Sequence, residues 1–210
     1  MQRAARSQGR LLDVGAGHRR IVPHATTIDI MPGPCVDIVA DARAMPFVDG
    51  ACEGVWLEAL LEHVENPEAV LKETHRVLRD GGWLYCEVPF LQGEHAAPAD
   101  YRRWTRRGLE QLFDGWELQW LEPASGPFSA LAYQMRVCLA VLTSFGSRRL
   151  YGLLFATIWA YVVWPIKFLD VLVRTNECAA ACSFGWALMA RKRQWVPGAS
   201  TEGEAERLQS

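Results

Sequence analysis

Short apolar runs alternate with helical and turn-forming segments along the first half of the chain. Runs rich in β-branched and aromatic residues, and one that alternates polar with apolar positions, predict strands at 11–15, 25–30, 36–42, 54–60, 83–90 and 116–121. Strands that alternate with helices favour βαβ units and a mainly parallel sheet. The pattern therefore predicts an α/β fold.

Two segments between these runs have helical spacing and recognisable ends. In 67–82, Pro67 suits the first turn, apolar residues recur at helical spacing, and the pair Gly81-Gly82 is expected to end the helix. A second helix is expected to begin after Thr105, whose hydroxyl can cap the first turn. These helices separate the fourth, fifth and sixth predicted strands.

The composition changes after the sixth strand, because apolar residues dominate from Pro123 to Leu172. A final strand with a basic end is then expected. The predicted domains are a core at 1–122, an apolar helical insertion at 123–182, and a last core strand at 183–193. The polar tail at 194–210 is expected to be disordered.

Length and charge narrow the class of protein. The 210 residues suit one sizeable α/β domain. Because Lys+Arg 22 nearly balance Asp+Glu 24, no nucleic acid is expected as a partner. The cysteines form no CxxC pair, so reduced thiols and no metal site are expected. The basic N-terminus leads into no signal-peptide core, which predicts a cytoplasmic location.

Candidate chemistry lies where the first two strands end. The sequence LLDVGAG places Asp13, Gly15 and Gly17 at a turn where the backbone can approach a ligand. Asp29 closes the second strand, where it can accept hydrogen bonds from both ribose hydroxyls of an adenosine. A nucleotide-dependent oxidoreductase would share these elements. However, the third glycine and the long helix that bind a pyrophosphate are missing after Gly17.

Five motifs in this order resemble the type 11 family of class I S-adenosylmethionine-dependent methyltransferases. They are LLDVGAG at 11–17, IDI at 28–30, VADARAMPF at 39–47, LEHVENPEAVLKETHRVLRDGG at 61–82 and EVPF at 87–90. The resemblance implies a Rossmann-like sheet of seven strands, the last antiparallel, with the apolar helical insertion between strands six and seven. It also implies S-adenosyl-L-methionine as the cofactor and a small-molecule, lipid or glycan acceptor.

The resemblance further implies which residues contact the cofactor. They are Asp13, Gly15, Ala16, Gly17, Asp29, Ile30, Asp41, Ala42 and Glu58. The glycine turn would line the methionyl part and Asp29 would bind the ribose. Ile30 would stack on adenine, whose amino group Asp41 would bind beside the backbone amide of Ala42. Glu58 would lie near the methionine moiety.

The sequence departs from the family pattern in two places. Arg19 stands where a further glycine is common, and the stretch from Gly17 to Asp29 leaves room for only a turn or two of helix. An N-terminal helix that often covers the cofactor is also expected to be missing, so that either the true start lies further upstream or the insertion supplies the lid. These departures favour an alternative function, a non-catalytic S-adenosylmethionine-binding or interaction module.

After the fifth strand, the sequence PADYRRWT resembles a stretch found in part of the family, often in enzymes that act on glycans, lipids or secondary metabolites. His95 could be a general base for an oxygen nucleophile, oriented by Asp100, or it could be structural. The residues at 101–103 would fix the loop or bind an anionic substrate. Glu62 and His63 look like an acid-base pair, but their place before the helix favours a role in ordering the loop.

The insertion contains an uncharged stretch, 150–166, bounded by basic residues. Its length is at the lower limit of the roughly 17 to 25 residues of a membrane span. A single crossing is excluded because strands six and seven belong to one sheet, and Arg136 would be unfavourable in a second span. We therefore expect an in-plane or re-entrant membrane element, or else packing on the core or on the second subunit of a homodimer.

Overall fold

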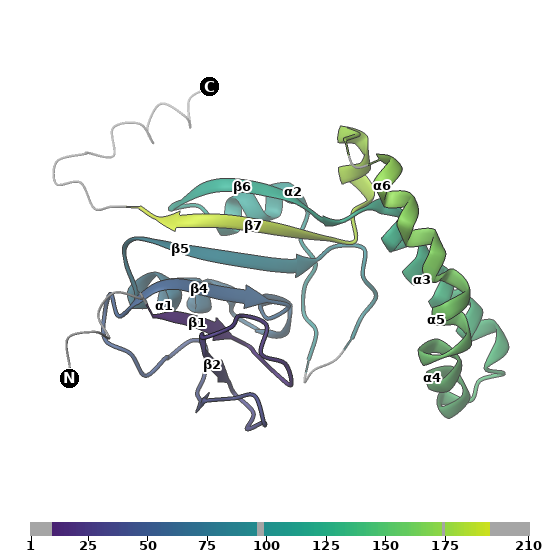
Figure 1. Ribbon diagram of the computed structural model, residues 1–210, viewed down its shortest axis with the longest axis horizontal. Coiled ribbons are helices and arrows are strands. Elements are labelled where there is room, and N and C mark those ends of the chain that lie inside the picture. The colour runs from purple at the N-terminus through teal and green to yellow at the C-terminus, as the bar shows by residue number, and fades with distance from the viewer. Residues whose placement is uncertain (1–9, 96–98, 174, 194–210) are drawn as a thin grey trace.

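The computed structural model describes residues 10–95, 99–173 and 175–193, and its body is one mixed sheet (Figure 1). The strands are β1 (Leu11–Val14), β2 (Thr26–Asp29), β3 (Ile38–Val39), β4 (Cys52–Glu58), β5 (Leu78–Pro89), β6 (Trp116–Ser125) and β7 (Gly185–Lys192). They lie in the order β3-β2-β1-β4-β5-β7-β6. Neighbours from β3 to β5 are parallel, and β7 is antiparallel to both β5 and β6. The predicted Rossmann-like seven-stranded sheet is confirmed.

The strand order reverses at β1, which lies between β2 and β4. In an open parallel sheet, a ligand binds outside the carboxyl ends of the strands at the place where the order reverses. The ends of β1, β2 and β4 carry the glycine turn, Asp29 and Glu58 respectively. The topology therefore gathers these predicted residues at one edge of the sheet.

Helices α1 (Pro67–Val77) and α2 (Arg106–Leu112) cover one face of the sheet (Figure 1). Thr105 caps α2 as predicted, since its Oγ1 accepts a hydrogen bond from the Gly108 N–H at 3.2 Å. The predicted end of the first helix at 82 is wrong, because α1 ends at Val77. Leu78 is fully buried and pairs with Cys52, so tertiary burial and sheet pairing end the helix before the glycines.

Burial alternates along the central strands, which shows that only one face of the sheet is covered. On β5, Leu84 and Cys86 are buried beneath the helices, whereas Trp83 and Tyr85 on the opposite face are only half-buried. Trp56 stacks on Tyr85, with ring centroids 3.7 Å apart. Within the described ranges, no helix covers this second face, so stacked aromatic side chains shield it in part.

Turns without a helix connect β1 to β2, although a helix of a turn or two was expected there. Arg20 holds this connection in place. It donates to the Ala25 carbonyl oxygen at 2.7 Å and forms an ion pair with Asp37 at 2.7 Å, just before β3. Asp37 in turn accepts from the Thr27 backbone N–H at 3.0 Å. Side-chain hydrogen bonds thus replace a covering helix as the support of this loop.

The insertion between β6 and β7 is a helical hairpin that projects away from the sheet (Figure 1). Its helices are α3 (Pro127–Thr143), α4 (Arg148–Ala156), α5 (Ile158–Val163), η3 (Trp164–Leu169), α6 (Asp170–Val173) and η4 (Glu177–Cys182). The returning helices pack along α3. The tail at 194–210, which was predicted to be disordered, lies outside the described residues.

Asp170 closes the base of this hairpin by capping α3 from a distant point of the chain. Its two carboxylate oxygens accept from the backbone N–H groups of Phe128 and Ser129 at 2.8 and 3.0 Å. The Ser129 hydroxyl donates to the same carboxylate at 2.6 Å. A carboxylate at a helix N-terminus satisfies otherwise unpaired donors and is favoured by the helix dipole. The cap therefore fastens the returning arm to the outgoing one.

Candidate active site

The glycine turn after β1 is folded back against β2. Gly15 and Gly17 have φ values of +82° and +56°, a region that favours glycine. The Gly15 and Ala16 N–H groups donate to the Ile28 carbonyl oxygen at 2.8 and 3.2 Å. A Cβ added at Gly15 would lie 2.9 Å from Leu60 Cδ1, while one at Gly17 would meet no atom within 4 Å. The turn is thus tight on its Gly15 side and open on its Gly17 side.

Asp29 lies directly beside that open side. Its Oδ2 accepts from the Gly17 N–H at 2.9 Å and its Oδ1 from the Met31 N–H at 2.8 Å. Each carboxylate oxygen has a second lone pair, so both can still accept from a diol. Ile30 and Met31 follow with 58% and 64% of their surface exposed, an apolar platform of the kind on which a flat ring can stack.

Asp13 and Glu58 place two acidic side chains on neighbouring strands near this turn. Asp13 is buried, and desolvation raises the pKa of its carboxyl, with the negative charge of Glu58 acting in the same direction. Its Oδ2 accepts from the Ile21 N–H at 3.4 Å. Glu58 accepts from Trp56 Nε1 at 3.1 Å and is half-buried. This local negative charge is complementary to a cationic ligand such as a sulfonium or an ammonium group.

Asp41 is less free than the resemblance implies. Arg43 donates from both Nε and Nη2 to its carboxylate, with the Nη2 contact at 2.7 Å, and this interaction lowers the pKa of Asp41. A contact with an adenine amino group would therefore share these oxygens with Arg43. The adjacent Ala42 is half-buried.

His95 and Asp100 are brought together after β5. The His95 N–H donates to Asp100 Oδ2 at 2.8 Å, and its ring Nδ1 lies 3.4 Å from the same oxygen. Asp100 is nearly fully buried against Arg103, whose guanidinium lowers the pKa of that carboxyl. The predicted pair is thus assembled, with Asp100 held by an arginine and in contact with the histidine.

The arginines of the PADYRRWT motif hold loops together. Arg102 donates to the carbonyl oxygens of Val64 and Glu65 at 3.0 and 2.7 Å. Arg103 donates to those of Gln92 and Gly93, both at 2.9 Å. Of the two predicted alternatives, the described contacts favour the one in which these residues fix the loop.

Glu62, for which the sequence favoured a role in ordering the loop, has an environment that the sequence pattern did not indicate. It is fully buried, and neither carboxylate oxygen has a hydrogen-bond partner within the described part of the chain. Burial raises the pKa of this carboxyl to about 7. Its Oε1 lies 3.8 Å from His63 Nε2 and 3.9 Å from His95 Nε2. An acidic residue inside the apolar run LLEHV was the available signal.

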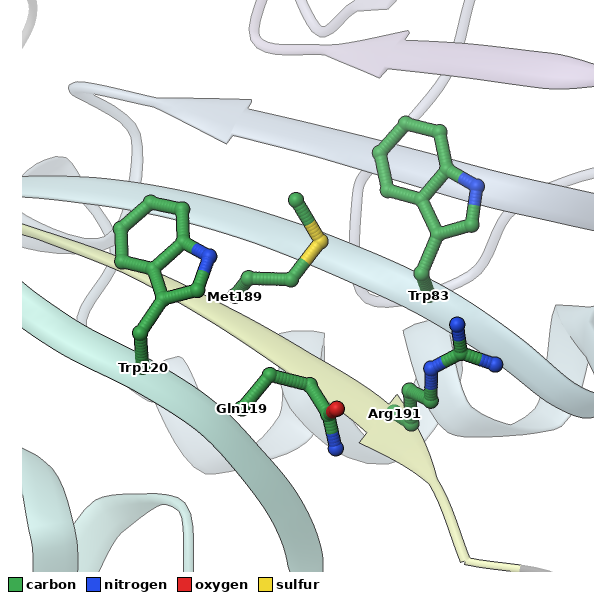
Figure 2. Close-up of a pocket in the computed structure, with 5 residues that line it drawn as sticks. All are labelled: Trp83, Gln119, Trp120, Met189 and Arg191. Atoms are coloured by element: carbon green, nitrogen blue, oxygen red, sulfur yellow. The ribbon is translucent and has the colours of Figure 1, made fainter.

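A separate hollow lies on the open face of the sheet (Figure 2). Its lining residues are Trp83, Gln119, Trp120, Met189 and Arg191. Trp83 pairs with Gly54, which in turn pairs with Leu11 at the start of β1. The hollow is therefore level with the amino ends of the parallel strands, away from the edge that carries Asp29 and His95.

The strand order and the glycine turn define the class I methyltransferase fold, and comparisons with known proteins agree. Residues 12–86 match the Methyltransf_11 family, described as Methyltransferase domain. The predicted family is confirmed. A 48-residue stretch, 23% of this chain and 20% of the relative, is 42% identical to a ubiquinone/menaquinone biosynthesis C-methyltransferase of Desulfotalea psychrophila. An uncharacterised transposon protein of Streptomyces fradiae is 26% identical over 42% of this chain and 26% of its own length.

Solved structures match over most of the chain at low identity. A 1,6-didemethyltoxoflavin-N1-methyltransferase of Burkholderia thailandensis, solved with S-adenosylhomocysteine, has a TM-score of 0.53 and 13% identity over 89% of this chain and 72% of its own. A geranyl diphosphate C-methyltransferase of Streptomyces coelicolor, also solved with S-adenosylhomocysteine, has a TM-score of 0.50 and 13% identity over 88% and 70%. The [4+2]-cyclase SpnF has a TM-score of 0.52 and 21% identity over 89% and 75%.

These comparisons support an S-adenosylmethionine-dependent methyltransferase and the predicted cofactor, since two matched neighbours contain S-adenosylhomocysteine. The likeness of the solved structures shows the fold alone, and a cyclase shares it. The chain's matched stretches span only 20% and 26% of the lengths of its curated relatives. The acceptor must therefore be argued from this chain's own surface.

Proposed function

We propose that the chain methylates an acceptor held at the carboxyl edge of the sheet, with S-adenosylmethionine as the methyl donor. The observation that carries the proposal is the unit made by the open glycine turn and Asp29, with two exposed apolar side chains beside it. The unit offers an adenosine two carboxylate acceptors for its ribose and an apolar surface for its ring. The cofactor supplies an electrophilic methyl group, and the protein's own residues bind, orient and exclude water.

The predicted roles follow the geometry of this edge. The Gly17 side of the turn and Asp29 would hold the ribose and the methionyl chain, and Asp13 with Glu58 would attract the positively charged end. His95 would accept the proton of an oxygen nucleophile, and Asp100 would hold its ring. Asp41 would contribute only in competition with Arg43.

The hairpin supports an acceptor that is met at a membrane surface. Many of its large apolar side chains are exposed, and the most exposed are Leu142, Phe145, Tyr161, Val171 and Leu172. One helical stretch, Arg148–Val173, is long and apolar enough to span a membrane, and only 6% of its most apolar window is buried. A patch of this extent on a soluble protein marks contact with a membrane or with another chain.

In the sequence, Arg136 argued against a second membrane span, and the hairpin shows how this charge is accommodated. Its guanidinium carbon lies 3.7 Å from the centre of the Phe155 ring, and its Nε donates to the Phe155 carbonyl oxygen. This contact lies beside the helix break at Thr157, between α4 and α5. The arginine is therefore partly satisfied inside the hairpin, which lowers the penalty of placing it against lipid.

The charges indicate how the hairpin would lie. Arg148 and Arg149 are near its tip, whereas Lys167 is near its base. Basic residues at both ends favour a hairpin that lies along the surface, with its charges at the headgroups, over one inserted tip first. We propose that the protein associates with the cytoplasmic face of a membrane and methylates a lipid or another small apolar acceptor there. A homodimer that buries the same surface is the alternative.

Calorimetric titration tests the proposed function directly. S-adenosylhomocysteine should bind stoichiometrically, whereas NADH should not, because the pyrophosphate motif is broken. Methyl-labelled S-adenosylmethionine, incubated with lipid and polar metabolite extracts, should then label an acceptor in the lipid fraction. Binding of S-adenosylhomocysteine without any methyl transfer would favour the non-catalytic module. Arg19 and the lack of a helix between β1 and β2 also support that alternative. No binding of either ligand would overturn the proposal.

A further inference from the structure

We propose that Glu62, His63 and His95 form a binding site for one divalent transition-metal ion. Their ligand atoms, one from each residue, all lie within 4.8 Å of one another. Two imidazoles and one carboxylate are a donor set that suits Zn²⁺, Fe²⁺, Co²⁺ or Mn²⁺ and is poorly matched to Mg²⁺ or Ca²⁺. Sequence spacing did not indicate a metal site, because His95 follows the other two residues on a different loop.

Both imidazole rings are oriented for this role. Nδ1 of His63 contacts the Ala99 carbonyl oxygen, and Nδ1 of His95 lies 3.2 Å from the Gly93 carbonyl oxygen. A carbonyl only accepts, so a proton on each Nδ1 would match these contacts and leave a lone pair on each Nε2; Arg103 Nη2, a donor, also lies 3.5 Å from His95 Nδ1. The two rings are perpendicular, with centroids 5.0 Å apart. A backbone carbonyl that fixes the tautomer is the usual outer contact of a metal-binding histidine.

The three groups converge without a donor between them. Glu62 Oε1 lies 3.8 and 3.9 Å from the two Nε2 atoms, which is beyond hydrogen-bond distance. The Glu62 carboxylate is fully buried, with no partner on either oxygen in the described ranges. A cation at the centre would satisfy all three lone pairs. With metal–ligand distances of about 2.0–2.2 Å, the ligand atoms would need to approach by roughly half an ångström each.

The site has a closed side and an open side. The Glu62 side chain is inaccessible, whereas those of His63 and His95 are 11% and 32% exposed. Three protein ligands with an open side leave positions for water or for an acceptor oxygen, as in catalytic metal sites. The use of these positions in methyl transfer rests on the proposed function, while metal binding does not. With a metal bound, His95 would be a ligand instead of a general base.

Titration of the chelator-stripped full chain tests the site. The background should carry Cys178→Ser and Cys182→Ser, because those exposed thiols could bind metal themselves. We expect one equivalent of Zn²⁺ to bind by calorimetry with a micromolar or lower dissociation constant. One equivalent of Co²⁺ should give visible d–d absorption without a thiolate charge-transfer band. Absence of any 1:1 complex would overturn the proposal.

Variants locate the metal. Glu62→Gln and His95→Gln should each weaken Co²⁺ binding at least about 30-fold, the loss seen when a ligand or its close support is removed. His24→Asn is the matched control: His24 is exposed and has a φ of +64°, which asparagine tolerates, so its affinity should not change. Undiminished binding in either ligand variant would overturn the proposal. If Glu62→Gln fails to fold, His95→Gln, on a partly exposed loop, decides.

S-adenosylhomocysteine affinity separates this inference from the proposed function. The ligand variants should keep that affinity, because the cofactor edge is built by Gly17 and Asp29. A protein that binds Co²⁺ but not S-adenosylhomocysteine would retain the metal site and refute the methyltransferase. A protein that binds S-adenosylhomocysteine but not Co²⁺ would refute the metal site and leave the proposed function standing.

Discussion

The Gly17 backbone N–H donates to Asp29 Oδ2 at 2.9 Å, and this bond joins the turn after β1 to the end of β2. The acid therefore both orders the turn and faces the space beside it. A substitution at either residue should change the cofactor site but not the packing of the hydrophobic core, because Asp29 is the half-buried last residue of β2.

Asp29→Ala should weaken S-adenosylhomocysteine binding by about 1 to 3 kcal/mol, since the ribose hydroxyls lose a charged acceptor and the turn loses its anchor. Calorimetry measures this change. Asp114→Ala, after α2, is the control and should leave the affinity unaltered. An Asp29→Ala protein with full affinity would refute the ribose assignment.

Gly15→Val should abolish S-adenosylhomocysteine binding. At a φ of +82° a β-branched side chain is strained, and its Cβ would lie 2.9 Å from Leu60. Circular dichroism should still show the sheet, because the strain is confined to the turn that follows β1. Retained affinity in a folded variant would mean that the ligand contacts another part of the sheet edge.

The ion pair between Arg20 and Asp37 should make the protein more sensitive to acid. Arg20 holds the pKa of Asp37 below its ordinary value. A carboxyl whose folded pKa is depressed contributes stability above its unfolded pKa of about 4, and this contribution is lost as the pH falls through the folded value. Between pH 7 and pH 3, the melting temperature of the Asp37→Asn variant should therefore fall less than that of the unaltered protein. An equal loss in both would contradict the expectation.

Alkylation should distinguish two groups of cysteines. Cys52 is buried, and desolvation raises the pKa of its thiol to about 11. Cys86 is buried as well, and its pKa is raised in the same way. Cys138 and Cys178 are exposed. Brief treatment with iodoacetamide at pH 8, followed by mass spectrometry, should modify only the exposed thiols until a denaturant is added. Early labelling of Cys52 would show that the sheet opens or is packed differently.

The parts of this structure that sequence could predict are those whose signals are local. Apolar runs, the glycine turn and the Thr105 cap each need only neighbouring residues, and all three are found. The end of α1 was missed because it depends on Leu78 pairing with Cys52 across the sheet. Glu62 was assigned only to a loop because its burial beside His95 is set by a segment after the next strand.

The contacts of the insertion were also beyond local signals. In the sequence, Arg136 argues only against a second membrane span, and its interaction with Phe155 cannot be predicted from local signals. Likewise, Asp170 has no evident role in sequence, although it caps a helix that begins more than forty residues earlier. Hydrogen bonds between residues far apart in the sequence depend on the tertiary fold, so they cannot be predicted from sequence periodicity.

The hairpin should bind lipid vesicles through both its apolar and its basic residues. Burial of one large aliphatic or aromatic side chain contributes about 1.5 to 3 kcal/mol, so several together give stable binding. The protein should sediment together with vesicles of phosphatidylcholine and phosphatidylglycerol. High salt should release only part of it, because screening weakens the contribution of Arg148, Arg149 and Lys167 but not the apolar one.

Substitution of exposed hairpin residues tests which contact the surface makes. Leu142→Asp with Leu153→Asp and Ile158→Asp should abolish sedimentation and leave S-adenosylhomocysteine affinity intact, since these side chains are exposed and far along the chain from the glycine turn. Trp159 is unsuitable because its Nε1 donates to Thr143 Oγ1 and holds the hairpin together. Val48→Asp, an equally apolar exposed site on the core, is the control and should sediment normally. If the unaltered protein stays in the supernatant as a dimer, and the triple variant is a monomer by light scattering, the hairpin is a subunit interface and the membrane proposal is wrong.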